Sequence, residues 1–364
     1  MVTKVSKKHA TIGGSIVLFA LASIFILGYT GLAATEYHSA NADAPERYIP
    51  LPVLNRAEYD ARLLALAHVK PVATSSLATA STTARLASST PRLWPVHTVY
   101  PDAGAILPFK RIVAYYGNFY STGMGVLGEY SPSVVLSMLA STTAMWAAAD
   151  PTTPTIPAIQ YIAVVAQGSP GKEGKYILRM PDDQIDKALD MANQVHGLLI
   201  LDVQVGLSTV QHELPMLEKY LAMPNVELAI DPEFSMKYGN PPGTVIGTFD
   251  ASDINYAAQY LASLVRANHV PPKVLLVHRF TPEMVTNYKK IQPLPEVQIV
   301  MDMDGWGSVA KKKGTYQRVI TAEPVQFTGI KLFYKADLKP PSTRMLTTGE
   351  VLGLMPTPIY IQYQ

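Results

Sequence analysis

The chain has 364 residues, no cysteine and a formal net charge of +2, and charged residues make up 16% of it. Without cysteine, the protein cannot form disulfides, thiolate metal sites or a cysteine nucleophile. The near-zero net charge argues against nucleic acid as a partner, because phosphate binding requires a basic surface. Hydrophobic residues make up 48%, enough to bury one large core or two small ones.

The N-terminal region predicts a membrane segment. Residues 10–35 carry no charge, and three lysines lie among the first eight residues. About 20 apolar residues span a bilayer, and flanking positive charge stays in the cytoplasm. We therefore expect a cytoplasmic basic tail over 1–10 and a single-pass transmembrane anchor over 11–34, with a cleaved signal peptide as the alternative. Either interpretation puts the rest of the chain on the extracytoplasmic side, anchored to the cell membrane or secreted.

Residues 35–107 predict a juxtamembrane helix followed by a stalk. The apolar residues of Leu54–Val69 recur at near-helical spacing, which predicts a short amphipathic helix. Residues 72–90 contain ten Ser or Thr and five Ala, with Arg85 as the single charge. Such a segment has too little apolar bulk to offset its ordering entropy, which is typical of a flexible stalk.

Residues 108–364 alternate between short apolar runs and helical stretches. Eight runs predict strands: Ile112–Gly117, Ala158–Ala166, Gly197–Val203, Val226–Ile230, Lys273–Val277, Val297–Met301, Phe327–Phe333 and Pro358–Tyr363. They are almost continuously apolar, as expected for strands covered on both faces. Eight strand–helix units in about 250 residues predict an α/β fold, a (β/α)₈ TIM barrel. A doubly wound open sheet is the alternative.

Helix signals lie between these strands. The predicted helices are Ser133–Ala148 after Pro132, Gln184–Val195 after Pro181, Ile254–Ala267 with Asp250 as cap, and Met284–Ile291 after Thr281-Pro282-Glu283. No helix follows the last predicted strand. We expect its outer face to be open or to be covered by residues 91–107.

Carboxylates gather where three predicted strands end, which is where TIM barrels carry their reactive residues. Side chains two residues apart share a face of a strand. We therefore expect three pairs to point into the barrel mouth: Asp202 with Gln204, Asp231 with Glu233, and Asp302 with Asp304. Five carboxylates in one concave site repel one another, so some should have raised pKa values, be hydrogen-bonded or bind a cation.

The same residues also fit a structural role, because an Asp at a strand end often caps a helix or binds loop amides. Asp202 and Asp302 lie further inside their strands and fit that role best. Glu233 and Asp304 are the better candidates for reactive groups.

Paired carboxylates suit hydrolysis of a glycosidic bond, in which one protonates the leaving oxygen and the other attacks or activates water. We expect Glu233 as the general acid and Asp304 or Asp302 as its partner, tuned by Asp202 or Asp231. Aromatic and polar side chains near the strand ends would bind a carbohydrate polymer: Tyr115, Tyr116, Asn118, Gln167, Gln204, His278, Trp306, Lys331, Tyr334 and Gln362. This chemistry requires no cofactor.

Two other functions fit the same residues. In a metal-dependent hydrolase, a divalent cation would be held by Asp231, Glu233, His278, Asp302 and Asp304. A non-catalytic barrel would bind glycans with the same aromatic and amide groups.

Two further motifs receive structural interpretations. Gly123–Gly128 matches G-x-G-x-x-G, but the helix that should follow the third glycine is delayed to Pro132. We interpret this segment as a loop at the barrel mouth. Lys311–Lys313 is interpreted as a solvated helix face.

Four segments together resemble a family of secreted or anchored bacterial barrel proteins of actinobacteria and candidate-phylum bacteria. They are Leu201–Gly206, Ile230–Phe234, Val277–Phe280 and Met303–Gly307. The resemblance covers about residues 109–364. It implies a glycoside-hydrolase-like TIM barrel outside the cytoplasm, but it implies no substrate and no catalytic residue.

Overall fold

The computed structural model describes residues 51–70 and 92–364. The predicted basic tail, the membrane segment 11–34 and the stalk 72–90 lie outside the described residues. The described residues, 51–70 and 92–364, belong to one compact unit.

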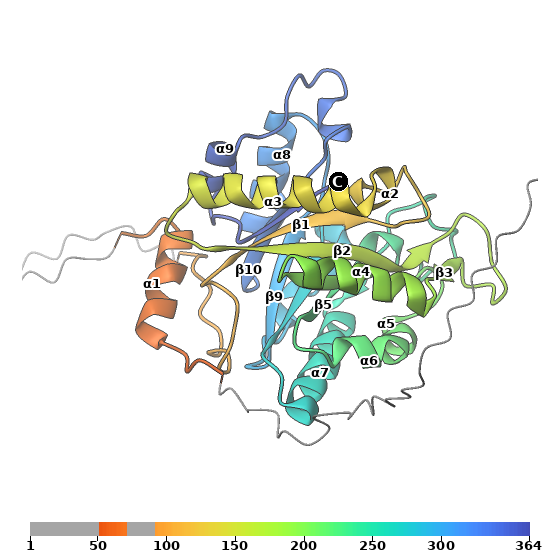
Figure 1. Ribbon diagram of the computed structural model, residues 1–364, viewed down its shortest axis with the longest axis horizontal. Helices are drawn as coiled ribbons and strands as arrows, with labels where there is room; N and C mark the ends of the chain where they lie inside the picture. The colour runs from red at the N-terminus through yellow and green to blue at the C-terminus, as the bar shows by residue number, and fades with distance from the viewer. Residues whose placement is uncertain (1–50, 71–91) are drawn as a thin grey trace, which may run out of the picture. The chain divides into compact units, whose positions relative to one another are not determined.

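Eight parallel strands close into a barrel (Figure 1). They are β1 (Arg111–Gly117), β2 (Thr155–Ala166), β4 (Leu198–Val203), β5 (Val226–Ile230), β7 (Lys273–His278), β9 (Val297–Met303), β10 (Phe327–Leu332) and β11 (Tyr360–Tyr363). Ile112 of β1 pairs with Ile156 of β2 on one side and with Tyr360 of β11 on the other. Because the first and last strands are paired, the barrel is closed, which confirms the predicted TIM-type fold and excludes the open sheet.

Three short strands lie outside the barrel. β3 (Ile177–Arg179) pairs antiparallel with the end of β2. β6 (Phe249–Asp250) and β8 (Val285–Thr286) pair with each other in parallel.

The helices cover the outside of the barrel and its two ends (Figure 1). They are α1 (Arg56–Leu66), α2 (Val126–Glu129), α3 (Pro132–Ala149), α4 (Asp182–Gln194), α5 (Val210–Glu213), α6 (Glu218–Leu221), α7 (Ala251–Asn268), α8 (Val309–Thr315) and α9 (Thr348–Leu352). Short 3₁₀ turns are η1 (Leu214–Leu217), η2 (Pro232–Phe234), η3 (Pro282–Met284), η4 (Tyr288–Lys290) and η6 (Ala336–Leu338), and η5 (Tyr316–Thr321) is a π-helical turn that continues α8.

Four of the predicted helices are confirmed, as α1, α3, α4 and α7. Asp250 caps α7 in a capping box with Asp253, as its position in the sequence indicates. The predicted helix over Met284–Ile291 is wrong. Val285 and Thr286 pair with β6 as β8, and Asn287 adopts a left-handed φ of 57°, so the chain forms only the isolated turns η3 and η4.

The N-terminal end of the barrel is closed by α1 and by residues 92–107. Tyr59 and Leu63 of α1 pack with Ile112, Leu276 and other interior residues at the base of the strands. Leu107 exchanges two hydrogen bonds with the side chain of Gln298, at 2.9 and 2.6 Å. Burial of each large apolar side chain stabilises the fold by roughly 1.5–3 kcal/mol. Residues 92–107 therefore support the base of the barrel.

A side chain of α3, Trp146, covers the outer face of β11. The Trp146 indole donates to the Tyr363 hydroxyl at 3.0 Å, and the ring of Tyr334 stacks on Tyr363. The expectation that residues 91–107 would cover this face is wrong, because the described part of that segment lies at the other end of the strand.

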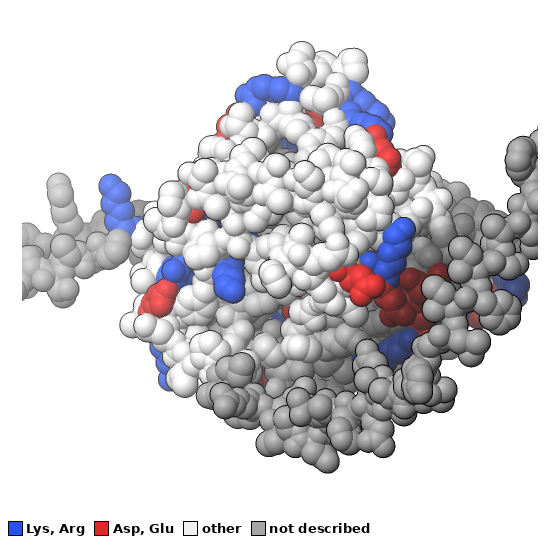
Figure 2. Space-filling model, in the orientation of Figure 1, with Lys and Arg blue, Asp and Glu red and all other residues white. Residues whose placement is uncertain are grey.

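Within the described residues, α3 is the one helix long and apolar enough to cross a membrane by length and composition. It carries no charged residue, and the surface above it in Figure 2 is correspondingly uncharged. Val135, Leu139 and Trp146 on its other face are buried in the core beside β1 and β2.

Candidate active site

A cavity of about 530 Å³ lies at the C-terminal ends of the strands. Seven of the residues predicted for the site line it: Tyr116, Gln204, Asp231, Glu233, Asp304, Trp306 and Lys331. They come from β1 and β10 and from the segments that follow β4, β5 and β9. The placement at this end of the barrel agrees with the position of reactive groups in TIM-barrel enzymes.

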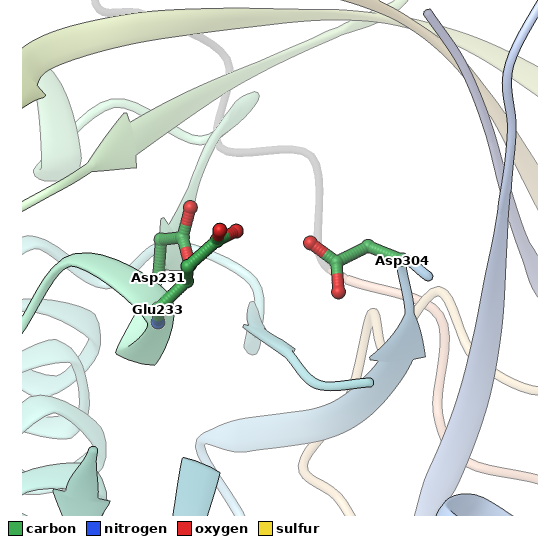
Figure 3. Close-up of side chains that lie close together, drawn as sticks. All are labelled: Asp231, Glu233 and Asp304. Carbon is green, nitrogen blue, oxygen red and sulfur yellow. Dashed lines mark hydrogen bonds between the residues drawn. The ribbon is translucent and has the colours of Figure 1, made fainter. Parts of the chain in front are cut away.

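Asp231, Glu233 and Asp304 point toward one another (Figure 3). One oxygen from each carboxylate lies within 4.8 Å of the others. Asp231 and Glu233 follow β5, whereas Asp304 follows β9 and faces them from the other side (Figure 3).

The local backbone fixes the direction of Glu233. Asp231 Oδ1 accepts a hydrogen bond from the Glu233 amide at 3.0 Å, which holds the chain in the turn η2. Gly247 donates to the Glu233 carbonyl at 2.7 Å. A Cβ on Gly247 would lie 2.5 Å from the Pro232 carbonyl oxygen, so only glycine permits this contact. Asp231 therefore binds a loop amide, which is the structural role that the sequence analysis considered for a strand-end Asp.

Glu233 is a carboxyl group adapted to hold a proton near neutral pH. Burial and the charge of Asp304 raise its pKa to about 7, against the opposing charges of Lys331 and His278. Burial also raises the pKa of Asp231 well above its usual value, and Asp304 and Glu233 add to the effect.

His278 lies among three buried carboxylates beneath the cavity. Its Nε2 lies 2.8 Å from Asp202 Oδ2, and its Nδ1 lies 3.4 Å from Oδ2 of both Asp302 and Asp304. Burial disfavours the charged imidazole, but these three carboxylates outweigh it and raise the pKa of His278 well above its usual value. The imidazolium is therefore the main counter-charge of the acidic cluster.

The two deeper carboxylates respond differently to burial. The charge and hydrogen bond of His278 outweigh burial at Asp202 and lower its pKa. At Asp302 burial dominates and raises the pKa, with a further increase from Asp304. Gln160 donates to Asp202 at 2.6 Å, and the hydroxyl of Tyr360 donates to the Gln160 carbonyl oxygen. Asp202, Asp302 and His278 do not line the cavity, and they act on its carboxylates through their charges.

Lys331 brings a positive charge to the cavity wall. Its ammonium lies 3.7 Å from the centre of the Tyr116 ring, a cation–π contact. Burial and the nearby carboxylates raise the pKa of the Tyr116 hydroxyl well above its usual value. That hydroxyl is 3.4 Å from the Gln204 amide nitrogen.

Besides His278, five residues predicted to bind substrate lie outside the cavity lining: Tyr115, Asn118, Gln167, Tyr334 and Gln362. Tyr115 points outward, where its hydroxyl meets those of Thr142 on α3 and Tyr334 at 2.8 and 3.0 Å. Side chains alternate along β1, so Tyr116 faces inward and Tyr115 cannot. The other three are Asn118, which bonds the Ile162 carbonyl and the Tyr120 amide, Gln167 in the turn between β2 and β3, and Gln362, buried opposite Lys331 in the register.

Several cavity residues were not predicted. Phe234, Phe280 and Phe333 add aromatic walls, each one or two residues beyond a predicted polar position. Gly123 and Met124 also line the cavity, which agrees with a loop at the barrel mouth, although a short helix, α2, follows them.

The interpretation of Lys311–Lys313 as a solvated face agrees with the exposure of Lys311 and is wrong for Lys312. Lys311 lines the cavity together with Thr315 and Arg318. Lys312 is buried, and its ammonium lies 3.1 Å from Asp337. Lys313 is paired with Glu350 at 3.0 Å.

No protein-family model and no curated protein matches the chain. The function is therefore inferred from the geometry and charge of the site.

Proposed function

We propose that the protein is a glycoside hydrolase that acts on a carbohydrate polymer with retention of configuration. The observation that carries this proposal is the pair of Glu233 and Asp304. Their carboxylates face each other across the cavity with oxygens within 4.8 Å. Retaining glycosidases have carboxyl groups about 5–5.5 Å apart, whereas inverting enzymes need roughly 6.5–9.5 Å to admit a water molecule. The 4.8 Å limit refers to single oxygens of the two carboxylates, and this close approach favours the retaining class.

Glu233 is the proposed acid/base. With a pKa of about 7 it carries its proton in a neutral or mildly acidic solution. In the first step it protonates the glycosidic oxygen as the bond to the anomeric carbon breaks. In the second step its carboxylate takes a proton from the water that attacks the same carbon.

Asp304 is the proposed nucleophile. It attacks the anomeric carbon in the first step and is released by water in the second. Asp231 is less suited to this role, because its Oδ1 holds the Glu233 amide and its raised pKa favours the protonated form. His278 lies 3.4 Å from Asp304, and its positive charge stabilises a carboxylate at that position.

Aromatic side chains would hold the sugar rings. Trp306 lines the cavity with 48% of its surface exposed, and Phe280 and Phe333 line the same cavity. Flat apolar ring faces suit the C–H faces of sugars, while Gln204 offers an amide to hydroxyl groups.

We also propose that the barrel acts outside the cytoplasm. The support is the uncharged segment 10–35 behind three lysines and the resemblance to secreted or anchored barrel proteins. Protease treatment of intact cells expressing the full chain would degrade an external barrel, whereas an internal barrel would be protected until lysis.

Metal-dependent hydrolysis is the second candidate, favoured by the three carboxylate oxygens within 4.8 Å of one another. Such a cluster can supply the oxygen ligands that hard divalent cations prefer. Elemental analysis of the purified protein, with activity measured before and after chelation, tests it. A stoichiometric metal and loss of activity on chelation would favour this candidate over the glycosidase.

The test of the main proposal is turnover of envelope and plant polysaccharides by the wild type, Glu233→Gln and Asp304→Asn. Loss of a general acid or nucleophile should reduce the rate by about 10²–10⁴-fold. Glu58→Gln is the matched control, because Glu58 is exposed on α1 at the opposite end of the barrel. Binding of a glycan without turnover would instead favour a non-catalytic glycan-binding barrel.

A further inference from the structure

One wall of the cavity is basic, and the hydrolysis mechanism does not use it. Lys311, Thr315 and Arg318 line the cavity from α8 and the π-helical turn η5. Residues four and three positions apart on a helix share a face, so this element presents two cations to the cavity. Lys331 of β10 adds a third cation to the lining.

These three cations differ from their neighbours in having no acidic partner. Over residues 51–70 and 92–364, the side chains of Lys311, Arg318 and Lys331 make no ion pair and no hydrogen bond. The adjacent lysines on the same helix, Lys312 and Lys313, are paired with Asp337 and Glu350. The fold therefore neutralises the lysines that point away from the cavity and leaves the cavity cations available.

Two of these cations instead lie against aromatic rings that line the cavity. The Lys311 ammonium is 4.6 Å from the centre of the Trp306 ring, and that of Lys339 is 5.0 Å from it. The Lys331 ammonium is 3.7 Å from the centre of the Tyr116 ring. Positive charge therefore gathers at Trp306 and Tyr116, two aromatic residues of the cavity lining.

Lys311 and Arg318 are exposed and Lys331 is buried, and none of them forms an ion pair with a described residue that a ligand would have to break. A neutral glycan would give these cations nothing to pair with. A carboxylate or phosphate would pair with them through charge-assisted hydrogen bonds, and the guanidinium of Arg318 can bind either group with two parallel bonds. We propose that the cavity binds an acidic glycan, with its oxyanion substituents held by Lys311, Arg318 and Lys331. This inference rests on the proposed glycosidase function and specifies its substrate class.

Binding to the Glu233→Gln full-length protein, measured by isothermal titration calorimetry, tests the inference separately from catalysis. The probes are oligogalacturonate, the same oligosaccharide after carboxyl reduction, and a glycerol-phosphate-bearing wall glycan. We expect at least one acidic probe to bind at least about tenfold more tightly than the neutral probe, and its affinity to fall with added salt. The two acidic probes distinguish carboxylate from phosphate as the recognised group.

The double variant Lys311→Gln/Arg318→Gln on the same background should lose about tenfold or more in affinity for the acidic probe. Lys110→Gln, an exposed lysine before β1 at the opposite end of the barrel, should bind as before. Lys331→Met, examined separately, tests the third cation after circular dichroism has verified its fold.

Equal binding of the neutral probe, binding of no acidic probe, or an unchanged affinity in the double variant would overturn the inference. These outcomes are distinct from a failure of the proposed function, in which the wild type binds acidic glycans but cleaves none of them.

Discussion

The imidazole of His278 lies 2.8 Å from the carboxylate of Asp202 inside the barrel, and both side chains are buried. The other ring nitrogen faces Asp302 and Asp304 at 3.4 Å. One imidazolium therefore links the interior of the barrel to the carboxylate proposed as nucleophile. Its loss would leave several buried negative charges without their nearest counter-charge.

Substitution of that residue, His278→Gln, should destabilise the protein by about 3–5 kcal/mol, the usual cost of leaving a buried charge unpaired. Chemical denaturation at pH 7 measures the loss.

The matched experiment is the double variant His278→Gln/Asp202→Asn, which removes both members of the closest pair. We expect it to recover part of the lost stability, since the uncompensated carboxylate is gone. Additive effects of the two substitutions would contradict an interaction between them.

The raised pKa of Glu233 makes its contribution to stability depend on pH. Its pKa is about 7 in the folded protein against an ordinary value of 4.5, so its favourable contribution is complete below 4.5 and is lost as the pH rises through 7. Glu233→Gln cannot ionise. Relative to the wild type, this variant should gain about 1–2 kcal/mol of stability between pH 5 and pH 8, after allowance for solvent screening.

Thermal denaturation of both proteins at the two pH values measures this difference. The same gap at pH 5 and pH 8 would show that Glu233 does not have a raised pKa.

Gly329 of β10 leaves space for the side chains of Asp302 and Tyr360. A Cβ at this position would lie 2.7 Å from Asp302 Oδ1 and 2.8 Å from Cδ1 of Tyr360. Gly329→Ala should therefore cost about 1–3 kcal/mol, as overpacking does elsewhere, and should lower activity because Asp302 must move. Gly314→Ala is the control. Gly314 lies in α8 with nothing near its added Cβ, and alanine there should be neutral or stabilising by up to about 1 kcal/mol.

Asp250 should matter for stability alone. Its carboxylate accepts from Ser252 at 3.1 Å and from Thr286 at 2.7 Å, and it also bonds Asn287. Asp250→Ala should destabilise the protein by about 1–2 kcal/mol with unchanged turnover, as measured by urea denaturation and a rate assay. These hydrogen bonds lower the pKa of Asp250, so the stabilisation is present above its ordinary value of 3.8 and is lost as the pH falls below it.

The strands of the barrel were predictable because strands buried on both faces leave continuous apolar runs in the sequence. The helix predicted over Met284–Ile291 failed for a reason that lies elsewhere in the chain. Residues 285 and 286 pair as a strand with Phe249 and Asp250, which lie more than thirty residues earlier in the chain. Local sequence signals do not contain information about such a distant pairing.

The carboxylates of the site were predictable in part. The positions of Asp231, Glu233 and Asp304 at strand ends indicated that they would lie close together, and their carboxylate oxygens do so. All three follow their strands, so alternation along a strand does not explain their proximity. Because side chains alternate along β1, Tyr115 must face outward when Tyr116 faces inward, so the two tyrosines could not both line the cavity. The basic wall was missed because the helical pattern of Lys311–Lys313 does not reveal that one side of the helix borders a cavity while another is buried against Asp337.

The configuration of the first-formed product tests the central claim most directly. Proton NMR during hydrolysis of an acidic oligosaccharide that the wild type cleaves distinguishes the two anomers before they equilibrate. The close approach of Glu233 and Asp304 predicts retention, with no signal from Asp304→Asn. Inversion, or undiminished hydrolysis by Asp304→Asn, would contradict it.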